Sequence, residues 1–390
     1  MGTPDITRAA PDGEGHEAMR EISAAVLLEG GQPTAIETLL LDDPHPGEVL
    51  VRMTSAGVCH SDLHVRDGHW ERPGPIVMGH EGAGVIEAVG EGIDLAILGR
   101  SVALSWYAPC LRCRNCQLGR QWICSGSPAL GHAQADGTSR TTRPGGQPVL
   151  TYLSIGTMAS AQVVPATAVV PMPDGVPPEV AALIGCGVAT GVGAVLKTAQ
   201  VPPGATVAVI GLGGVGLSCV MGAALAGASR IVAVDVNPAK IDLAGEFGAT
   251  HRVHAAPGDD RGVVEAIKAA AGNGGPDFVF EAIGLPETIS QAIASTPPGG
   301  TAVLVGLTRY GQQATFEPFP FVDGGRRILG SNYGSAVAAI DFPRYAELYL
   351  AGRLPIDRLI DRRLPLTDLE DAFDRLRAGQ AARQMVMFPG

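Results

Sequence analysis

The chain of 390 residues has little charge and no long apolar run. Charged residues make up 17 % of it, where about 25 % is usual. The formal net charge is −11 and the isoelectric point is 5.3. Nucleic-acid-binding proteins usually present a basic face, so that class is excluded. No apolar run approaches the roughly 18 residues that cross a bilayer, so we expect no membrane partner.

The N-terminus lacks the features of a signal peptide. Residues 1–20 are polar and acidic without a continuous apolar region, so we expect a disordered extension and a cytoplasmic protein. Disulfides are rare in a reducing compartment, and clustered cysteines there more often bind metal. The chain has seven cysteines, and an odd number argues against a simple disulfide framework.

The organisation of the chain indicates two domains. Glycine (53) and proline (30) are frequent but follow no period, which excludes a fibrous protein. Segments 48–53 and 84–89 alternate like strands, without long helices between them, and predict an antiparallel, mainly β domain. Strand-like apolar runs alternate with helical segments after about residue 187, which predicts an α/β domain with a doubly wound parallel sheet. The pattern loosens again from about residue 330, so the second domain is inserted in the first.

Four cysteines lie within fifteen residues, in the spacing C-x2-C-x2-C-x7-C. Closely spaced thiolates can close a tetrahedron around Zn²⁺ and leave no open position, so the pattern predicts a structural zinc site. Four unrelated core thiols are the alternative, which the polar residues between them disfavour. The predicted ligands are Cys110, Cys113, Cys116 and Cys124.

A second set of potential ligands is dispersed along the chain. It consists of the segment 59–64 (CHSDLH), the pair His80 and Glu81, and Cys186. Two cysteines and a histidine can give zinc three protein ligands and one exchangeable position. Taken alone, each residue is better explained as a core thiol or a hydrogen-bonded histidine, so the residues by themselves do not establish a zinc site.

A G-x-G-x-x-G pattern follows an apolar strand, opens a helix and precedes Asp235 at the end of the next strand. This context is typical of a dinucleotide-binding turn, in which glycines let backbone amides approach the pyrophosphate. Asp235 would bind the adenosine ribose and repel a 2′-phosphate, which favours NAD over NADP. A glycine-rich turn that merely packs closely is the alternative. The pattern comprises Gly211, Leu212, Gly213, Gly214, Val215 and Gly216.

From about residue 21 onward the sequence resembles the zinc-dependent medium-chain alcohol dehydrogenases. The resemblance rests on GVCHSDLH, GHEGAG, the four-cysteine loop, DGTSR at 136–140, LIGCGVATG and GLGGVG followed by VDVN. It implies a Rossmann domain over 189–329, inserted in a GroES-like catalytic domain over 21–188 and 330–390. The DGTSR loop is similar to that of the class I and class III enzymes, which implies a homodimer.

The resemblance also implies the catalytic zinc ligands: Cys59, His80 and Cys186. Glu81 is either a ligand during water exchange or a hydrogen-bond acceptor beside the site, and we favour the acceptor. Asp62 would orient His80. The family therefore implies two zinc ions per chain, one catalytic and one structural.

Further positions match residues that bind the coenzyme or move a proton in the family. His60 and Arg383 would lie at the NAD pyrophosphate, Lys240 at the ribose and Thr190 at the nicotinamide. Solvated surface charges are the alternative for Lys240 and Arg383. Ser61 would take the proton of the substrate, which passes through the coenzyme ribose to His64. Packing in the core is the alternative for this pair.

The expected activity is reversible, NAD-linked oxidation of primary or aromatic alcohols, by hydride transfer from an alkoxide that zinc stabilises. Trp70 and Trp106 match substrate-pocket positions, where two indoles would favour small or flat substrates, although either could be ordinary core. The alternative is a mycothiol- or glutathione-type formaldehyde dehydrogenase. Trp70 argues against the glutathione adduct, because class III enzymes carry an acidic residue there, whereas the segment LYLAGRLPIDRLI is similar to mycothiol-linked relatives and keeps another thiol adduct open. A non-catalytic NAD- or zinc-binding protein is a third, weaker reading. Cys219 is expected to pack in the core.

Overall fold

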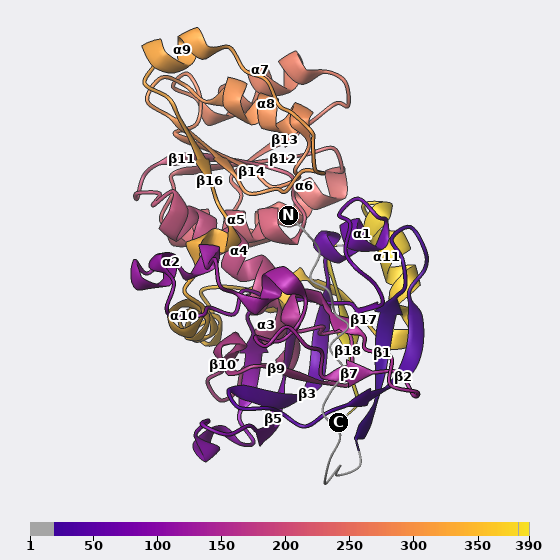
Figure 1. The fold of residues 1–390 in the computed structure, drawn as a ribbon. Coiled ribbons are helices and arrows are strands. Elements are labelled where there is room, and N and C mark those ends of the chain that lie inside the picture. The colour runs from indigo at the N-terminus through magenta and orange to yellow at the C-terminus, as the bar shows by residue number, and fades with distance from the viewer. Residues whose placement is uncertain (1–18, 381, 390) are drawn as a thin grey trace.

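The computed structural model describes residues 19–380 and 382–389, which form three β-sheets. Figure 1 shows a parallel sheet with its flanking helices in the upper part of the molecule and the other two sheets in the lower part. The predicted extension over 1–20 lies outside the described residues, except for Met19 and Arg20. Arg20 already belongs to the first strand.

The lower part is mainly antiparallel, as predicted, with parallel pairing only at β4–β8 and β17–β18 among the described residues. One sheet has the order β7 (Thr141–Thr142), β2 (Ala35–Leu41), β1 (Arg20–Leu27), β4 (Ile76–Val77) and β8 (Leu150–Thr151). The other has the order β10 (Val169–Pro171), β6 (Ser101–Leu104), β5 (Gly82–Val89), β3 (Glu48–Val58), β18 (Arg383–Met387) and β17 (Ile360–Leu364), with β9 (Ala161–Pro165) also paired to β3.

The upper part is the predicted doubly wound parallel sheet. Its strands follow the order β13 (His251–His254), β12 (Arg230–Asp235), β11 (Thr206–Ile210), β14 (Phe278–Glu281), β15 (Thr301–Leu304) and β16 (Arg327–Gly330). The flanking helices are α5 (Gly214–Leu225), α6 (Pro238–Ala244), α7 (Asp260–Ala271), α8 (Pro286–Ser295) and α9 (Pro318–Asp323). The central strands are buried, which explains their continuous apolar runs. The sequence analysis did not identify strands β13 and β16, because these edge strands are short and partly polar.

One helical segment corrects an expectation from the sequence. Pro178–Thr198 is continuous and, by length and composition, apolar enough to cross a membrane, so the expectation that no such run exists was wrong. It is buried in the protein over 83 % of its most apolar window, as a core helix is. Its parts are α3 (Pro178–Leu183), a π-helical stretch (Ile184–Val188), α4 (Ala189–Gly193) and a second π-helical stretch (Ala194–Thr198).

The remaining helices surround the lower part. They are α1 (His60–Arg66), α2 (Arg114–Gln117), α10 (Ala338–Leu350) and α11 (Leu369–Arg377). Helix α11 is amphipathic and buries Leu369, Phe373 and Leu376. The domain bounds at 188/189 and 329/330 remain predictions. The first of them falls inside the continuous helical segment, and the second at the end of β16.

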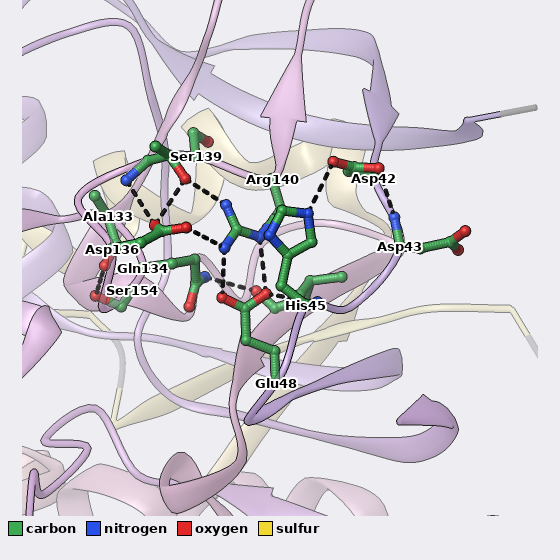
Figure 2. A network of polar contacts seen from close by, with 12 residues as sticks. Asp42, Asp43, His45, Glu48, Ala133, Gln134, Asp136, Ser139, Arg140 and Ser154 are labelled. Carbon is green, nitrogen blue, oxygen red and sulfur yellow. Dashed lines mark hydrogen bonds and ion pairs between the residues drawn. The ribbon is translucent and has the colours of Figure 1, made fainter. Parts of the chain in front are cut away.

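A buried ion-pair network fastens the long loop over 125–150 to strand β3. The Arg140 side chain is only 3 % exposed and donates to both carboxylate oxygens of Glu48, at 2.8 and 2.7 Å (Figure 2). The same guanidinium bonds to Asp136, at 2.7 Å, and to Thr138. The DGTSR segment is therefore fixed to the strand that leads into Cys59.

This network predicts a large loss of stability on removal of Arg140. We expect Arg140→Leu to lower the free energy of unfolding by about 3–5 kcal/mol, because it leaves the buried Glu48 carboxylate without its partner. Arg143 also donates to both carboxylate oxygens of a glutamate, Glu37, but these two side chains are more exposed to solvent. As the matched control, Arg143→Leu should cost about 0–1 kcal/mol. Equal losses in urea unfolding of the two variants would contradict this interpretation of the network.

Candidate active site

The fold brings together the three residues that are expected to bind the catalytic zinc. The ligand atoms of Cys59, His80 and Cys186 all lie within 4.8 Å of one another, and the three residues are 6, 2 and 7 % exposed. Cys59 follows the end of strand β3 and is the N-cap residue of α1, and His80 lies in the loop before β5. Cys186 lies in the π-helical stretch of the long helix, and such stretches are frequent at functional sites. Three distant segments thus meet at one buried point.

Asp62 fixes the orientation of the His80 ring. It is fully buried, and its carboxylate lies 2.9 Å from His80 Nδ1 and accepts a bond from the backbone N–H of Cys59. Burial alone would lower the pKa of His80, but the Asp62 carboxylate and then Cys59 together offset this and raise the pKa well above its usual value. With Nδ1 engaged, Nε2 faces Cys186 Sγ at 3.3 Å. This is the arrangement in which an outer carboxylate holds a metal-binding histidine.

The donor set fits zinc. A hydrogen bond from Cys186 lowers the pKa of the Cys59 thiol well below its ordinary value, and a thiolate is the form that binds metal. Two sulfurs and one imidazole nitrogen supply three ligands, which leaves a fourth position for an exchangeable molecule. The chain can therefore hold a zinc ion here that remains open to substrate.

Glu81 lies beside this cluster and is not one of its three members. Its carboxylate accepts a bond from the backbone N–H of Gly187 at 3.0 Å and lies 3.7 Å from Arg383 Nη1. Burial raises the pKa of Glu81 to about 7. Gly57 makes room for it, since a Cβ there would lie 1.8 Å from Glu81 Oε1. This position matches the acceptor role that the sequence favoured, and the ligand role stays a prediction.

The glycine-rich turn lies between β11 and α5. Gly211 has a φ of 91°, and a Cβ on Gly216 would lie 1.7 Å from the carbonyl oxygen of Gly211, so only glycine fits. The Asp235 carboxylate accepts bonds from Leu212 N and Asn237 N, at 2.8 and 2.9 Å. It is thereby placed at the end of β12 beside the turn, where the dinucleotide pattern requires an acidic residue.

Arg383 joins the glycine-rich turn to the metal cluster. It is 4 % exposed, and a Cβ on Gly214 would lie 1.9 Å from its Nε. That Nε has no hydrogen-bond partner within residues 19–380 and 382–389. A buried cation with a free N–H at the N-terminus of α5 fits the pyrophosphate of a dinucleotide. The same residue faces Glu81, so one guanidinium contacts both halves of the site.

Arg383 and Lys240 lie close enough to His60 for their charges to act on its ring, and the coenzyme-binding roles of the three residues stay predictions. The His60 ring reaches solvent but is enclosed by surrounding protein. This enclosure, followed by the positive charges of Arg383 and Lys240, lowers the pKa of His60 to about 4. His60 is therefore neutral near pH 7 and can donate a hydrogen bond without adding charge. Thr190 lies partly exposed on α4, four residues after Cys186.

Ser61 and His64 lie on α1 directly after Cys59, both partly exposed. Positions three apart share a helix face, so one face presents both side chains. The Trp70 ring packs against His64, with centroids 4.8 Å apart, and its indole N–H donates to the Thr308 carbonyl at 3.2 Å. Trp70 is thus tied to the loop after β15, which the sequence did not indicate.

Two tyrosines contact His80 or the neighbour of Cys186, and Trp106 packs on one of them. Trp106 packs against Tyr333, with centroids 4.5 Å apart. The Tyr333 hydroxyl donates to the carbonyl of Gly185, the neighbour of Cys186. Tyr152 is buried and meets the His80 ring edge-on at 5.8 Å. Sequence reasoning missed Tyr152 and Tyr333, because neither lies in a motif and only the fold brings them to the cluster.

The four-cysteine loop forms a second cluster, separate from the first. Its four sulfur atoms lie within 4.8 Å of one another. Helix α2 begins after Cys113, whose sulfur accepts a bond from Cys116 N–H. Backbone hydrogen bonding lowers the pKa of Cys113 to about 5. Leu111 and Leu118 beside the cluster are exposed, so this lobe has little apolar core and fits a structural metal. Cys219 is fully buried, as expected for a packing residue.

This second cluster predicts a specific loss of one metal ion. We expect Cys113→Ala to lower the zinc content from about two to about one per chain and to lower the melting temperature, because the lobe loses its cross-link. The control variant is Cys219→Ala, which removes a thiol of similar size from the core and should retain both ions. Elemental analysis with thermal unfolding makes the comparison. An unchanged melting temperature in Cys113→Ala would refute a structural role.

Two family models match the chain. "Alcohol dehydrogenase GroES-like domain" matches residues 45–174, and "Zinc-binding dehydrogenase" matches residues 214–351. The chain is 36 % identical to an alcohol dehydrogenase class-3 of Drosophila melanogaster, over 94 % of this chain and 97 % of that one. It is 34 % identical to an S-(hydroxymethyl)glutathione dehydrogenase of Paracoccus denitrificans, over 94 % and 99 %.

A solved structure is also similar along the whole chain. The benzyl alcohol dehydrogenase of Acinetobacter calcoaceticus superposes with a TM-score of 0.89 at 31 % identity, covering 95 % of this chain and 100 % of that one. Its likeness extends over both the mainly β part and the parallel sheet. The chain therefore belongs to the zinc-dependent medium-chain alcohol dehydrogenase family.

Proposed function

We propose that this enzyme oxidises primary or aromatic alcohols reversibly to aldehydes, with NAD as the hydride acceptor. The observation that carries the proposal is the buried cluster of Cys59, His80 and Cys186, which offers three ligands and leaves a fourth position open. Arg383 connects it to the glycine-rich turn, so substrate and coenzyme sites adjoin. The closed four-cysteine cluster has no such open position.

The residues around the cluster of Cys59, His80 and Cys186 have different roles in the proposed reaction. Zinc held by Cys59, His80 and Cys186 would supply a Lewis acid that makes the hydroxyl group of an alcohol more acidic, and NAD would supply the hydride acceptor. Asp62 keeps His80 Nε2 directed at the cluster. Ser61 is placed to take the alcohol proton and His64 to pass it on, since both lie on one face of α1. Arg383 and the neutral His60 hold the pyrophosphate.

Specificity is proposed from the aromatic residues and from the relatives. Trp70 is buried against His64, and Trp106 packs on Tyr333, so the lining near the cluster offers flat apolar faces. The benzyl alcohol dehydrogenase relative supports an aromatic alcohol as substrate. The class-3 and S-(hydroxymethyl)glutathione relatives favour the second candidate, oxidation of a thiol adduct of formaldehyde.

An assay with two substrates tests this proposal. We expect benzyl alcohol to be oxidised with NAD, and NADP to be at least about 100-fold poorer in kcat/KM because the Asp235 carboxylate repels a 2′-phosphate. The second substrate is formaldehyde together with glutathione or mycothiol, and its oxidation is followed by the same absorbance of reduced coenzyme. Turnover only in the thiol arm would replace the first candidate by the second. Coenzyme binding without turnover in any arm would contradict both.

We also propose that the enzyme is a homodimer through the edge of the parallel sheet. Strand β16 is the last strand of that sheet, and the segment before it exposes Tyr310, Phe319 and Val322 by 75, 74 and 84 %. Exposed apolar side chains at an unpaired edge mark an interaction surface. We expect light scattering to give twice the mass of the chain, and Val322→Asp to shift it toward the monomer. A monomeric wild-type protein would refute the dimer.

A further inference from the structure

We propose that His69 extends the proton path beyond His64, so that the substrate proton leaves through a pair of histidines. This inference rests on the proposed alcohol oxidation and adds a residue that no motif of the sequence indicated. His69 does not touch the metal cluster or the glycine-rich turn in any contact of the structure's described part. It acts through His64 and is therefore a positioning residue.

The geometry of the pair is set by the turn that follows α1. The two Nδ1 atoms of His64 and His69 lie 3.2 Å apart, within hydrogen-bond distance. The backbone N–H groups of His69 and Trp70 both donate to the His64 carbonyl, at 2.8 and 3.2 Å. Gly68, with a φ of 73°, lets the chain reverse there. The backbone therefore holds the second ring against the first.

His64 is partly exposed, but Trp70 packs against its ring, so a second histidine beside it gives the proton a further way to solvent. The Trp70 ring packs against His64, with centroids 4.8 Å apart; Trp70 is only 7 % exposed, and its N–H donates to the Thr308 carbonyl. The next residue, Arg309, comes from the same loop and lies close enough for its charge to act on His64. His69 lies on the partly exposed side of the turn.

The charges around His64 favour transfer away from it. Burial lowers the pKa of His64, the charge that His69 carries when protonated and the positive charge of Arg309 lower it further, and Cys59 and Asp67 act in the opposite direction. A protonated His64 is thus less stable than a protonated imidazole in water. The proton taken up by His64 is therefore readily passed on.

The transfer is a proton exchange without change of oxidation state. His64 forms an N–H bond at Nε2 and breaks the one at Nδ1, while His69 forms an N–H bond at Nδ1 and releases the proton of Nε2 to water. Each ring is neutral at the start and at the end, with its tautomer exchanged. Return of both tautomers through water resets the pair before the next turnover.

The test compares His69→Gln with the wild-type enzyme in oxidation of benzyl alcohol by NAD across pH. We expect kcat near pH 6.5 to fall about 5- to 20-fold, because one proton-transfer partner is lost. The deficit should shrink above about pH 9 and be restored by a high concentration of imidazole buffer. Zinc content and NAD affinity should not change. His45→Gln, at an exposed histidine paired with Asp42, is the matched control and should behave as wild type.

A double variant separates a shared path from a structural effect. If both histidines act in series, His64→Gln combined with His69→Gln should be no slower than His64→Gln alone. The proposal would be overturned if the fold-losses in kcat of the two single variants multiplied in the double variant. It would also be overturned if His69→Gln had an unchanged pH profile and no rescue by imidazole. Thermal unfolding checks the fold, and His69→Ala is a second variant for the same assay. A wild-type enzyme without alcohol oxidation would instead overturn the proposed function, and this inference with it.

Discussion

The hydrogen bond between Asp62 and His80 is the contact on which the rest of the site depends. It is made in the protein interior, where an unpaired carboxylate or an unpaired imidazolium would be costly. By engaging Nδ1 of the ring, Asp62 leaves Nε2 directed at the two cysteine sulfurs. The backbone N–H of Cys59 bonds to the same carboxylate, so one buried side chain positions two of the three ligands.

The long helical segment Pro178–Thr198 connects this centre to the coenzyme site. It carries Cys186 in a π-helical stretch and Thr190 one turn later, so a predicted metal ligand and a predicted nicotinamide contact lie on the same helical segment. This helical segment packs closely against α5, because a Cβ on Gly191 would lie 2.4 Å from the carbonyl oxygen of Val215 in α5. Arg383 adds a second connection from β18. Metal, substrate and coenzyme positions are therefore set by packing as well as by polar contacts.

Local patterns in the sequence predicted what depends on local spacing. The four-cysteine loop and the glycine-rich turn each lie within fifteen residues, and their chemistry follows from that spacing. Cys59, His80 and Cys186 are far apart in the chain, so family resemblance, and not the residues alone, assigned them. The same reason explains the omissions. Tyr152 reaches His80 only through the fold, and His69 meets His64 only because Gly68 reverses the chain.

The most direct test of the central claim is a crystal structure of the enzyme with anomalous diffraction measured at the zinc absorption edge. The account predicts two peaks per chain. One should lie about 2.3 Å from the sulfurs of Cys59 and Cys186 and about 2.0–2.1 Å from His80 Nε2, with a solvent molecule in the fourth position. A single peak confined to the four-cysteine loop would contradict the account.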